Sequence, residues 1–96
     1  VALATARWLE GEALLYLNKT AQAAPLIEAA LRDVAGVAPN TKLHGDLTRS
    51  LGGIAAISGK VQDALRLYQR AHAIFRAAGE RRSQAIVLQD IGQIYW

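Results

Sequence analysis

The sequence nearly repeats itself every 40 residues, and this period constrains the fold more than any other feature. Gly11, Gly52 and Gly92 lie 41 and 40 residues apart. When the chain is aligned on these glycines, further positions match: Asn18 with Gly59, Ala23 with Ala64, Ile27 with Tyr68, and Ala30 with Ala71. A period of about 20–50 residues is typical of arrays in which each unit buries its apolar face against the next. We therefore expect a chain that holds a partner rather than one that transforms a substrate.

The composition favours an all-α fold. The chain has 96 residues, enough for one small domain with a modest core, and 52% of them are hydrophobic. Much of that share is alanine, the best helix former, and there are only two prolines, Pro25 and Pro39. The chain contains no cysteine, which excludes disulfides, thiolate metal sites and cysteine nucleophiles.

Five helices with short loops, each antiparallel to the last, are predicted by the apolar spacing. Their ranges are 2–17, 21–36, 42–57, 61–78 and from about 80–82 to the chain end. Thr20 is expected to cap the second helix, Pro25 to lie in or near its first turn, and Gly36 to end it, with 36–41 as the loop. Gly59 and Gly79 are expected to end the third and fourth helices. The residues expected to face inward are Ala2, Ala6, Leu9, Ala13 and Leu17, then Ala23, Ile27, Ala30, Leu31 and Val34, then Leu43, Leu47, Leu51, Ile54 and Ala55, then Val61, Ala64, Leu65, Tyr68, Ala71 and Phe75. The last helix has the apolar residues Ile86, Leu88, Ile91 and Tyr95. Of these, Ile91 and Tyr95 are expected to be left partly in water, together with Val87 or Leu88, because no partner helix follows.

The chain reads as a fragment of a longer protein, since it has no initiator methionine and stops in mid-pattern at Trp96. Its start carries Arg7, Glu10 and Glu12, unlike the core of a signal peptide. No apolar stretch reaches the ~18 residues needed to span a bilayer, so we expect no membrane contact. The sequence does not indicate a compartment, because a cysteine-free chain suits both the cytoplasm and the periplasm.

The net charge of +3 is mild, and residues 60–82 alone contribute +4, from six basic and two acidic residues. Arg66, Arg70 and Arg76 fall off the predicted apolar stripe of their helix, which is typical of an ordinary solvated face. The alternatives are an acidic protein partner and a nucleic acid or other anionic surface. A nucleic-acid site would need more phosphate-contacting cations and interleaved aromatics, whereas Tyr68 and Phe75 are expected to point inward. We therefore expect no nucleic-acid partner.

No group of residues indicates catalysis, a metal or a cofactor. His44 and His72 are 28 residues apart on different predicted helices, whereas a metal site needs several convergent ligands. Ser50, Ser58 and Ser83 have no nucleophile-elbow context, and Gly52-Gly53 is not followed by the lysine of a phosphate loop. We expect this chain not to be an enzyme.

The segment LGGIAAISGKVQDALRLYQRAHAIF resembles a tetratricopeptide repeat. The residues that carry the resemblance are Leu51-Gly52, Gly59, Ala64-Leu65, Tyr68 and Ala71, and the first unit keeps Gly11, Asn18, Ala23-Ala24, Ile27 and Ala30. The resemblance implies a right-handed α-solenoid of helix hairpins forming one domain over 1–96, with units 1–41 and 42–81 and half a unit at 82–96. In the family's logic, Tyr68 fills the gap between hairpins. The period exceeds the usual ~34 residues. It is similar to long-period arrays in bacterial signalling proteins, such as the sensory regions of diguanylate cyclases, histidine-kinase-like sensors and transcriptional regulators.

In tetratricopeptide arrays the first helix of each unit lines a concave groove, so the resemblance also implies a binding surface. The groove residues it implies are Trp8, Glu12, Tyr16, Arg49, Gly53, Gln89, Gln93 and Trp96. The first hypothesis is a scaffold that binds a peptide or protein segment there; tryptophan, tyrosine and arginine dominate binding hot spots. The second is a regulatory segment that associates with another copy, a homodimer through uncapped ends. The alternative for Trp8 is that it packs against a neighbouring hairpin.

Overall fold

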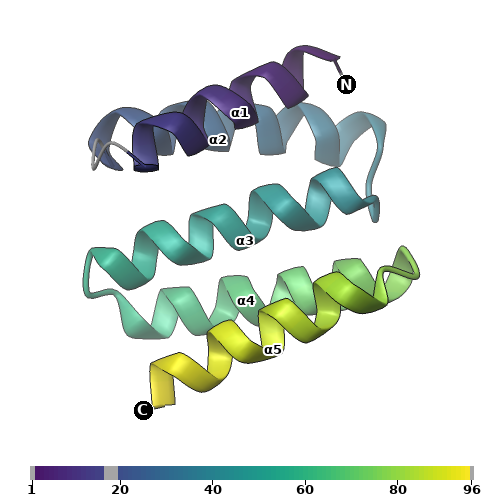
Figure 1. Cartoon of the computed structure of the whole chain (residues 1–96). Helices are drawn as coiled ribbons and strands as arrows, with labels where there is room; N and C mark the ends of the chain where they lie inside the picture. The colour runs from purple at the N-terminus through teal and green to yellow at the C-terminus, as the bar shows by residue number, and fades with distance from the viewer. Residues whose placement is uncertain (1, 17–19, 96) are drawn as a thin grey trace.

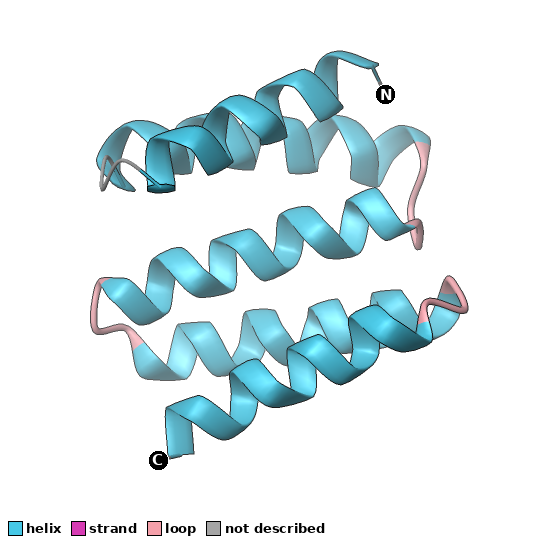
Figure 2. Cartoon of the chain, viewed as in Figure 1, coloured by secondary structure: helices cyan, strands magenta, loops and turns pink. Residues whose placement is uncertain are grey.

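The chain folds into five α-helices, as seen in a computed structural model (Figures 1 and 2). The structure describes the backbone of residues 2–16 and 20–95, and the side chains of residues 4–12 and 22–95. The helices are α1 (Ala2–Tyr16), α2 (Thr20–Val37), α3 (Lys42–Ile57), α4 (Val61–Ala77) and α5 (Arg81–Tyr95). The described residues contain no strand. The all-α class and the number of helices predicted from the sequence are confirmed for this part of the chain.

Consecutive helices run in opposite directions and pack against each other in chain order (Figure 1). A smaller contact joins α1 to α3. In Figure 1, α2 and α4 lie behind α1 and α5, so the helices alternate between a front and a back layer. The molecule is a flattened body of 36 × 31 × 18 Å.

The turns that end α3 and α4 have the same construction. Gly59 and Gly79 adopt φ values of +78° and +73°, which an L side chain disfavours. In the first turn the Lys60 N–H donates to the Ala55 carbonyl at 2.8 Å, and in the second the Glu80 N–H donates to the Phe75 carbonyl at 2.9 Å. These bonds make two equivalent Schellman turns. The predicted role of both glycines is confirmed.

The ends of α2 differ from the prediction. The helix continues through Gly36 to Val37, and the left-handed residue in the following turn is Asn40, with φ 55°. Asparagine tolerates this conformation because its short polar side chain bonds locally. The helix begins at Thr20 itself, whose side chain lies outside the described residues, and Pro25 therefore sits in the second turn rather than the first.

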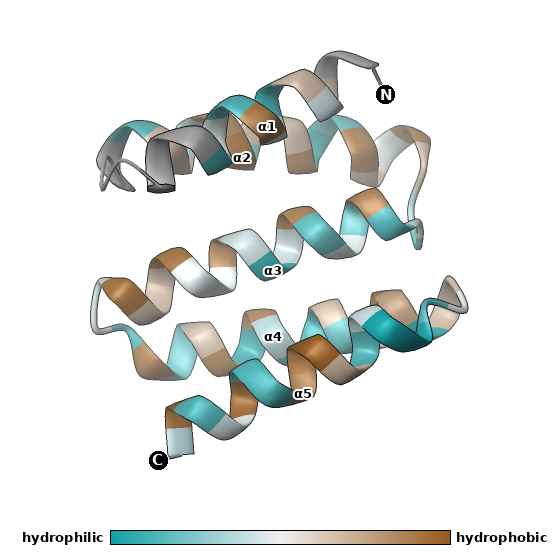
Figure 3. Ribbon diagram, viewed as in Figure 1, coloured by the Kyte–Doolittle hydropathy of each residue, from teal (hydrophilic) through white to brown (hydrophobic). Residues whose placement is uncertain are grey.

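The core consists of two clusters of buried side chains. The first joins α1, α2 and α3, and the second joins α3, α4 and α5. Figure 3 shows apolar and polar residues interleaved along the helices, as expected when each helix buries only part of its surface. The buried members of the first cluster are Ala4, Ala23, Ile27, Ala30, Val34 and Leu47, and those of the second are Ala55, Ala64, Tyr68, Ala71, Phe75 and Val87.

Glycines let the helices of each hairpin approach closely. A Cβ added at Gly11 would lie 2.5 Å from Ile27 Cγ1, and one added at Gly52 would lie 2.7 Å from the Tyr68 ring. These two contacts occupy equivalent positions of the sequence period, so the two hairpins pack in the same way. The Tyr68 ring packs on Gly52 within its own hairpin, and its cluster extends to Val87 of α5. It was expected to fill a gap between hairpins, and it contributes to both interfaces.

Two predicted inward faces are wrong in part. In α1, Ala6 and Leu9 are exposed, Leu9 by 57%, while Ala4 and Gly11 are buried. Apolar residues occur on every side of this alanine-rich segment, so its spacing did not single out one face. Val61, the first residue of α4, is also exposed. The predicted inward residues Ala2, Ala13 and Leu17 fall outside the described side chains.

The last helix, α5, leaves apolar side chains exposed to solvent. Leu88 and Tyr95 are exposed by 56% and 73%, as expected, and Ile86 is exposed by 38%. The side of the helix that meets α4 carries the buried residues Ser83 and Val87, together with the half-buried Ile91. Leu88 and Tyr95 are apolar residues on the side of α5 that no described helix covers.

Candidate functional site

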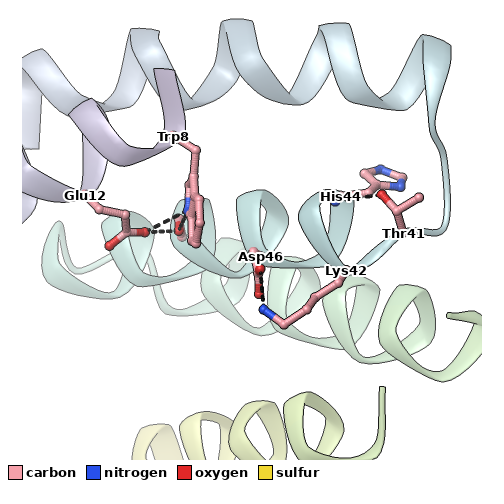
Figure 4. Close-up of polar contacts among 7 residues, drawn as sticks. Trp8, Glu12, Thr41, Lys42, His44 and Asp46 are labelled. Carbon is pink, nitrogen blue, oxygen red and sulfur yellow. Dashed lines mark hydrogen bonds and ion pairs between the residues drawn. The ribbon is translucent and has the colours of Figure 1, made fainter. Parts of the chain in front are cut away.

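Trp8 and Glu12, two of the expected groove residues, bind to α3 instead of facing solvent freely. The Trp8 indole N–H donates to Glu12 Oε1 and to Ser50 Oγ, both at 3.1 Å, and the Ser50 hydroxyl bonds to the same carboxylate. Figure 4 shows the Trp8 ring and the Glu12 carboxylate converging on α3. The Trp8 ring also packs against the first core cluster. This contact ties α1 to α3 and corresponds to the packing alternative for Trp8.

Arg49, in the equivalent position of the next unit, ties α3 to α5. Its guanidinium Nε donates to Asp90 Oδ2 at 2.5 Å, and its Nη2 donates to Asp90 Oδ1 at 3.2 Å. The hydrogen bond to Asp90 raises the pKa of Arg49, as a paired carboxylate does. The fork geometry fixes the relative position of the two helices.

The two contacts follow one rule of the sequence period. Trp8 and Arg49 each lie three residues before a repeat glycine, and their partners Ser50 and Asp90 each lie two residues before the next one. A donor of one unit thus meets an acceptor of the following unit. Sequence reasoning missed Ser50 and Asp90 as partners, although their common offset from Gly52 and Gly92 was a signal that could have found them.

The remaining residues of the expected groove are dispersed. Gly53 is half-buried, and a Cβ added to it would lie 3.7 Å from the Tyr68 hydroxyl oxygen. Gln93 lines a small pocket of about 300 Å³ with Tyr68 and Asp90, and Gln89 is exposed. Burial raises the pKa of the Tyr68 phenol, and the nearby Asp90 carboxylate adds to the effect. The Tyr16 side chain and Trp96 lie outside the described residues.

A larger groove lies on the opposite side of α3. It has a volume of about 820 Å³ and is bordered by α2, α3 and α4. We call it the back groove, because α2 and α4 form the rear layer in Figure 1. Its apolar residues are Ala24, Leu51, Ile54, Ala55 and Leu67, and its polar residues are Glu28, Ser58, Lys60, Asp63, Arg66 and Arg70.

The charges of the back groove are unevenly distributed between its walls. Arg66 pairs with Asp63 on its own helix. The side chains of Lys60 and Arg70 on the α4 side, and of Glu28 on α2, make no hydrogen bond or ion pair with another described residue. Among the described residues, the α4 wall therefore presents two unpaired cations and the α2 wall one unpaired carboxylate, beside an apolar floor.

Sequence reasoning placed Arg66 and Arg70 on a solvated face and predicted no groove beside them. The prediction of exposure is confirmed. The groove itself is formed by residues about 30–40 positions apart, such as Ala24 and Leu67. The packing of α2 and α4 on either side of α3 brings them together, and no local sequence pattern reports that packing.

His44 holds the turn between α2 and α3. Its Nδ1 accepts a hydrogen bond from the backbone N–H of Asn40 at 3.0 Å, and its own N–H donates to Thr41 Oγ1 at 3.3 Å, as Figure 4 shows for Thr41. The latter bond caps α3. Burial lowers the pKa of His44, and the positive charge of Arg70 lowers it further.

We expect stability to fall as the pH drops below about 6.5, the ordinary pKa of histidine. Because the folded-state pKa is lowered, the unfolded chain binds the proton first and unfolding is favoured at low pH. This loss is absent above the unfolded pKa and grows as the pH falls through it toward the folded value. His44→Gln, whose amide oxygen can accept the Asn40 bond, should have a smaller decrease in unfolding free energy between about pH 7.5 and about pH 5.5. Urea unfolding at both values checks this; identical decreases in the two proteins would contradict it.

No three histidine or carboxylate side chains among the described residues are grouped to hold a metal ion. None of the described helices is both long enough and apolar enough to cross a membrane. Comparison of the chain with protein-family models, with curated proteins and with solved structures finds no match.

Proposed function

We propose that this chain is a protein-interaction module of the tetratricopeptide type. The proposed architecture is a right-handed α-solenoid of helix hairpins with a period of about 40 residues. The equivalent close contacts of Gly11 with Ile27 and of Gly52 with Tyr68 support it, as do the equivalent bonds of Trp8 and Arg49 to the following unit. In such an array each unit contacts its neighbours and leaves an extended surface for a partner.

The proposed activity is the binding of a peptide or protein segment, and the back groove is the observation that carries it. Its volume of about 820 Å³ and its apolar floor provide a surface that a few apolar side chains can enter. The back groove is a better binding site than the expected groove over α1, α3 and α5. There the side chains of Trp8 and Arg49 already bond to neighbouring helices, and a ligand would have to displace those bonds.

The charges of the back groove define the partner's chemistry. Lys60 and Arg70 lie on the α4 side and have no partner among the described residues, so acidic residues of the bound segment belong there. Glu28 on the opposite wall favours a basic residue at the other edge of the segment. We propose an amphipathic segment with apolar residues facing Leu51 and Ile54 and an acidic side facing α4.

Selection from a random-peptide display library tests this proposal. The expected result is enrichment of peptides that combine apolar residues with aspartate or glutamate, and loss of their binding in an Ala24→Trp variant, because the indole would fill the groove. Ala35→Trp, at an exposed position of the same helix, is the matched control and should bind normally. If the selected peptides bind the Ala24→Trp and wild-type chains equally well, the back groove is not the binding site.

A second candidate function is self-association within a larger bacterial signalling protein, where the array would serve as a regulatory or sensory segment. The observation that favours it is the side of α5 that carries the exposed residues Leu88 and Tyr95. Exposed apolar patches on repeat arrays commonly mark the place where another surface is buried.

A further inference from the structure

One side of α5 carries four residues that no described helix covers. We call Ala85, Leu88, Gly92 and Tyr95 the α5 stripe; their spacing of three, four and three residues places them on one face of the helix. Ala85 is exposed, Leu88 is 56% exposed and Tyr95 is 73% exposed. A Cβ built on Gly92 meets no atom within 4 Å. The four residues are uncharged and form an open, mainly apolar surface, and the exposed Arg81 lies one turn before Ala85 on the same face.

In the preceding unit, the face that is equivalent to the α5 stripe packs against the next helix. Forty residues earlier, the equivalent residues of α3 are Gly45, Thr48, Gly52 and Ala55, all of them buried. Gly45 and Gly52 receive the Phe75 and Tyr68 rings of α4. The same face of α1, at Gly11, receives Ile27 of α2. Two of the three equivalent faces in this chain therefore bind a helix, and the face on α5 is free among the described residues.

The α3–α4 pair shows what this face requires of its partner. Seven residues separate Gly45 from Gly52, and seven residues separate Phe75 from Tyr68 in the opposite direction along the antiparallel α4. The small residues Ala71 and Ala64 alternate with these rings on α4 and are fully buried. The partner helix thus runs antiparallel and presents a large, small, large, small series, so that each large side chain meets a small residue.

The α5 stripe itself meets this requirement when it is read backwards. From the end of the helix the series is Tyr95, Gly92, Leu88 and Ala85, which is again large, small, large, small. Leu88 and Gly92 are symmetric about residue 90, and so are Ala85 and Tyr95. In an antiparallel pair of α5 helices related by a two-fold axis, each large residue would face a small one of the other copy.

We propose that two copies of this chain associate through an antiparallel α5–α5 contact. Leu88 fills the space above Gly92 of the partner subunit, and Tyr95 covers Ala85 of the partner subunit. The contact is reciprocal, so it closes at a dimer rather than extending into a fibre. This inference rests on the second candidate function, self-association. The proposed contact uses the α5 stripe in a defined register and does not involve the back groove.

The composition of the stripe predicts how dimerisation depends on salt concentration. All four residues are uncharged, so burial of apolar surface drives association and ionic screening has no pair to weaken. Dimerisation should be unchanged or strengthened when the salt concentration rises. Association through the cations of α4 would instead weaken.

A size-swap series in analytical ultracentrifugation tests the register. The wild-type chain should sediment as a concentration-dependent monomer–dimer mixture in the micromolar range. Gly92→Leu fills the space that Leu88 needs, and Leu88→Gly removes the filling side chain, so each single change should weaken dimerisation at least about tenfold. The double change, Leu88→Gly with Gly92→Leu, exchanges the two sizes in the same register and should restore the dimer. Arg82→Leu, at an exposed position off the stripe, should dimerise like the wild type.

Circular dichroism at low concentration keeps the test decisive, because it separates loss of the dimer from loss of the fold. Gly92→Leu should retain helicity, since the space around Gly92 is open. A wild-type chain that stays monomeric to high concentration, or a folded double variant that fails to recover the dimer, would overturn the proposal. Neither result would affect peptide binding in the back groove, and Ala24→Trp should leave the dimer intact.

Discussion

Replacing Tyr68 with alanine is expected to destabilise the chain by about 3 kcal/mol or more. The Tyr68 side chain is 7% exposed, packs on Gly52 and belongs to the cluster that joins α3, α4 and α5. Removing the ring leaves a cavity at the meeting point of three helices, and helices in van der Waals contact through a glycine cannot close much further. Small domains have a total stability of about 5–15 kcal/mol, so the loss is a large fraction of it.

Arg70→Ala is the control on the same helix, two residues away. Arg70 is exposed and makes no hydrogen bond or ion pair with a described residue, so its loss should change stability by less than about 0.5 kcal/mol. Urea unfolding of the three proteins at low concentration measures both effects. Equal midpoints for the two variants would show that the faces of α4 are assigned wrongly.

Gly52→Ala and Gly92→Ala are expected to change stability in opposite directions, although the two glycines are equivalent in the sequence period. At Gly52 the added methyl would lie 2.7 Å from the Tyr68 ring, and displacing a packed ring costs about 1–3 kcal/mol. At Gly92 the methyl meets nothing within 4 Å, so only the better helix propensity of alanine acts. It should stabilise the chain by about 0.5–1 kcal/mol.

Thermal or urea unfolding at concentrations below the dimer range measures this difference without contribution from association. Gly52→Ala should unfold earlier than the wild type and Gly92→Ala later. Two shifts of the same sign would mean that the glycines do not differ in surroundings, and the assignment of an open face to α5 would fail with them.

Local sequence signals predicted the elements of this fold well because their physical causes are local. Glycine at 59 and 79 permits the left-handed turn residue that ends a helix, and the hydrogen bonds of Lys60 and Glu80 complete the same turn twice. Residue 36 is also a glycine, but α2 continues through it, because Asn40, four positions later, adopts the left-handed conformation of the turn. Glycine identity alone does not say which residue of a turn region adopts that conformation.

The inward faces were predicted where one side of a helix is clearly apolar, as in α2 and most of α4, and not where apolar residues surround the helix. In α1 the choice among several apolar sides depends on the neighbouring helix, which the segment itself does not encode, and Leu9 is exposed for this reason. In α5 the sequence left open whether Val87 or Leu88 would be exposed, and contact with α4 buries Val87. Because the period aligned Gly92 with Gly52, it carried information about α5 that apolar spacing did not.

The candidate binding surface was the least predictable part. Trp8 and Arg49 belong to residue types common at binding hot spots, but the structure uses both in bonds between helices. The back groove combines residues of three helices, and its apolar floor and unpaired cations come from segments far apart in the chain. Such a site exists only after packing, so composition and local spacing do not reveal it.

The most direct test of the proposed binding function is a heteronuclear NMR titration of the labelled chain with a peptide enriched in the display selection. Amide shift changes are expected at residues that line the back groove, such as Ala24, Glu28, Ser58 and Leu67. Shift changes centred instead on Gly53, Gln89 and Gln93 would place the partner over α1, α3 and α5 and contradict the back groove. If no enriched peptide changes any amide shift, the chain is not a peptide-binding module.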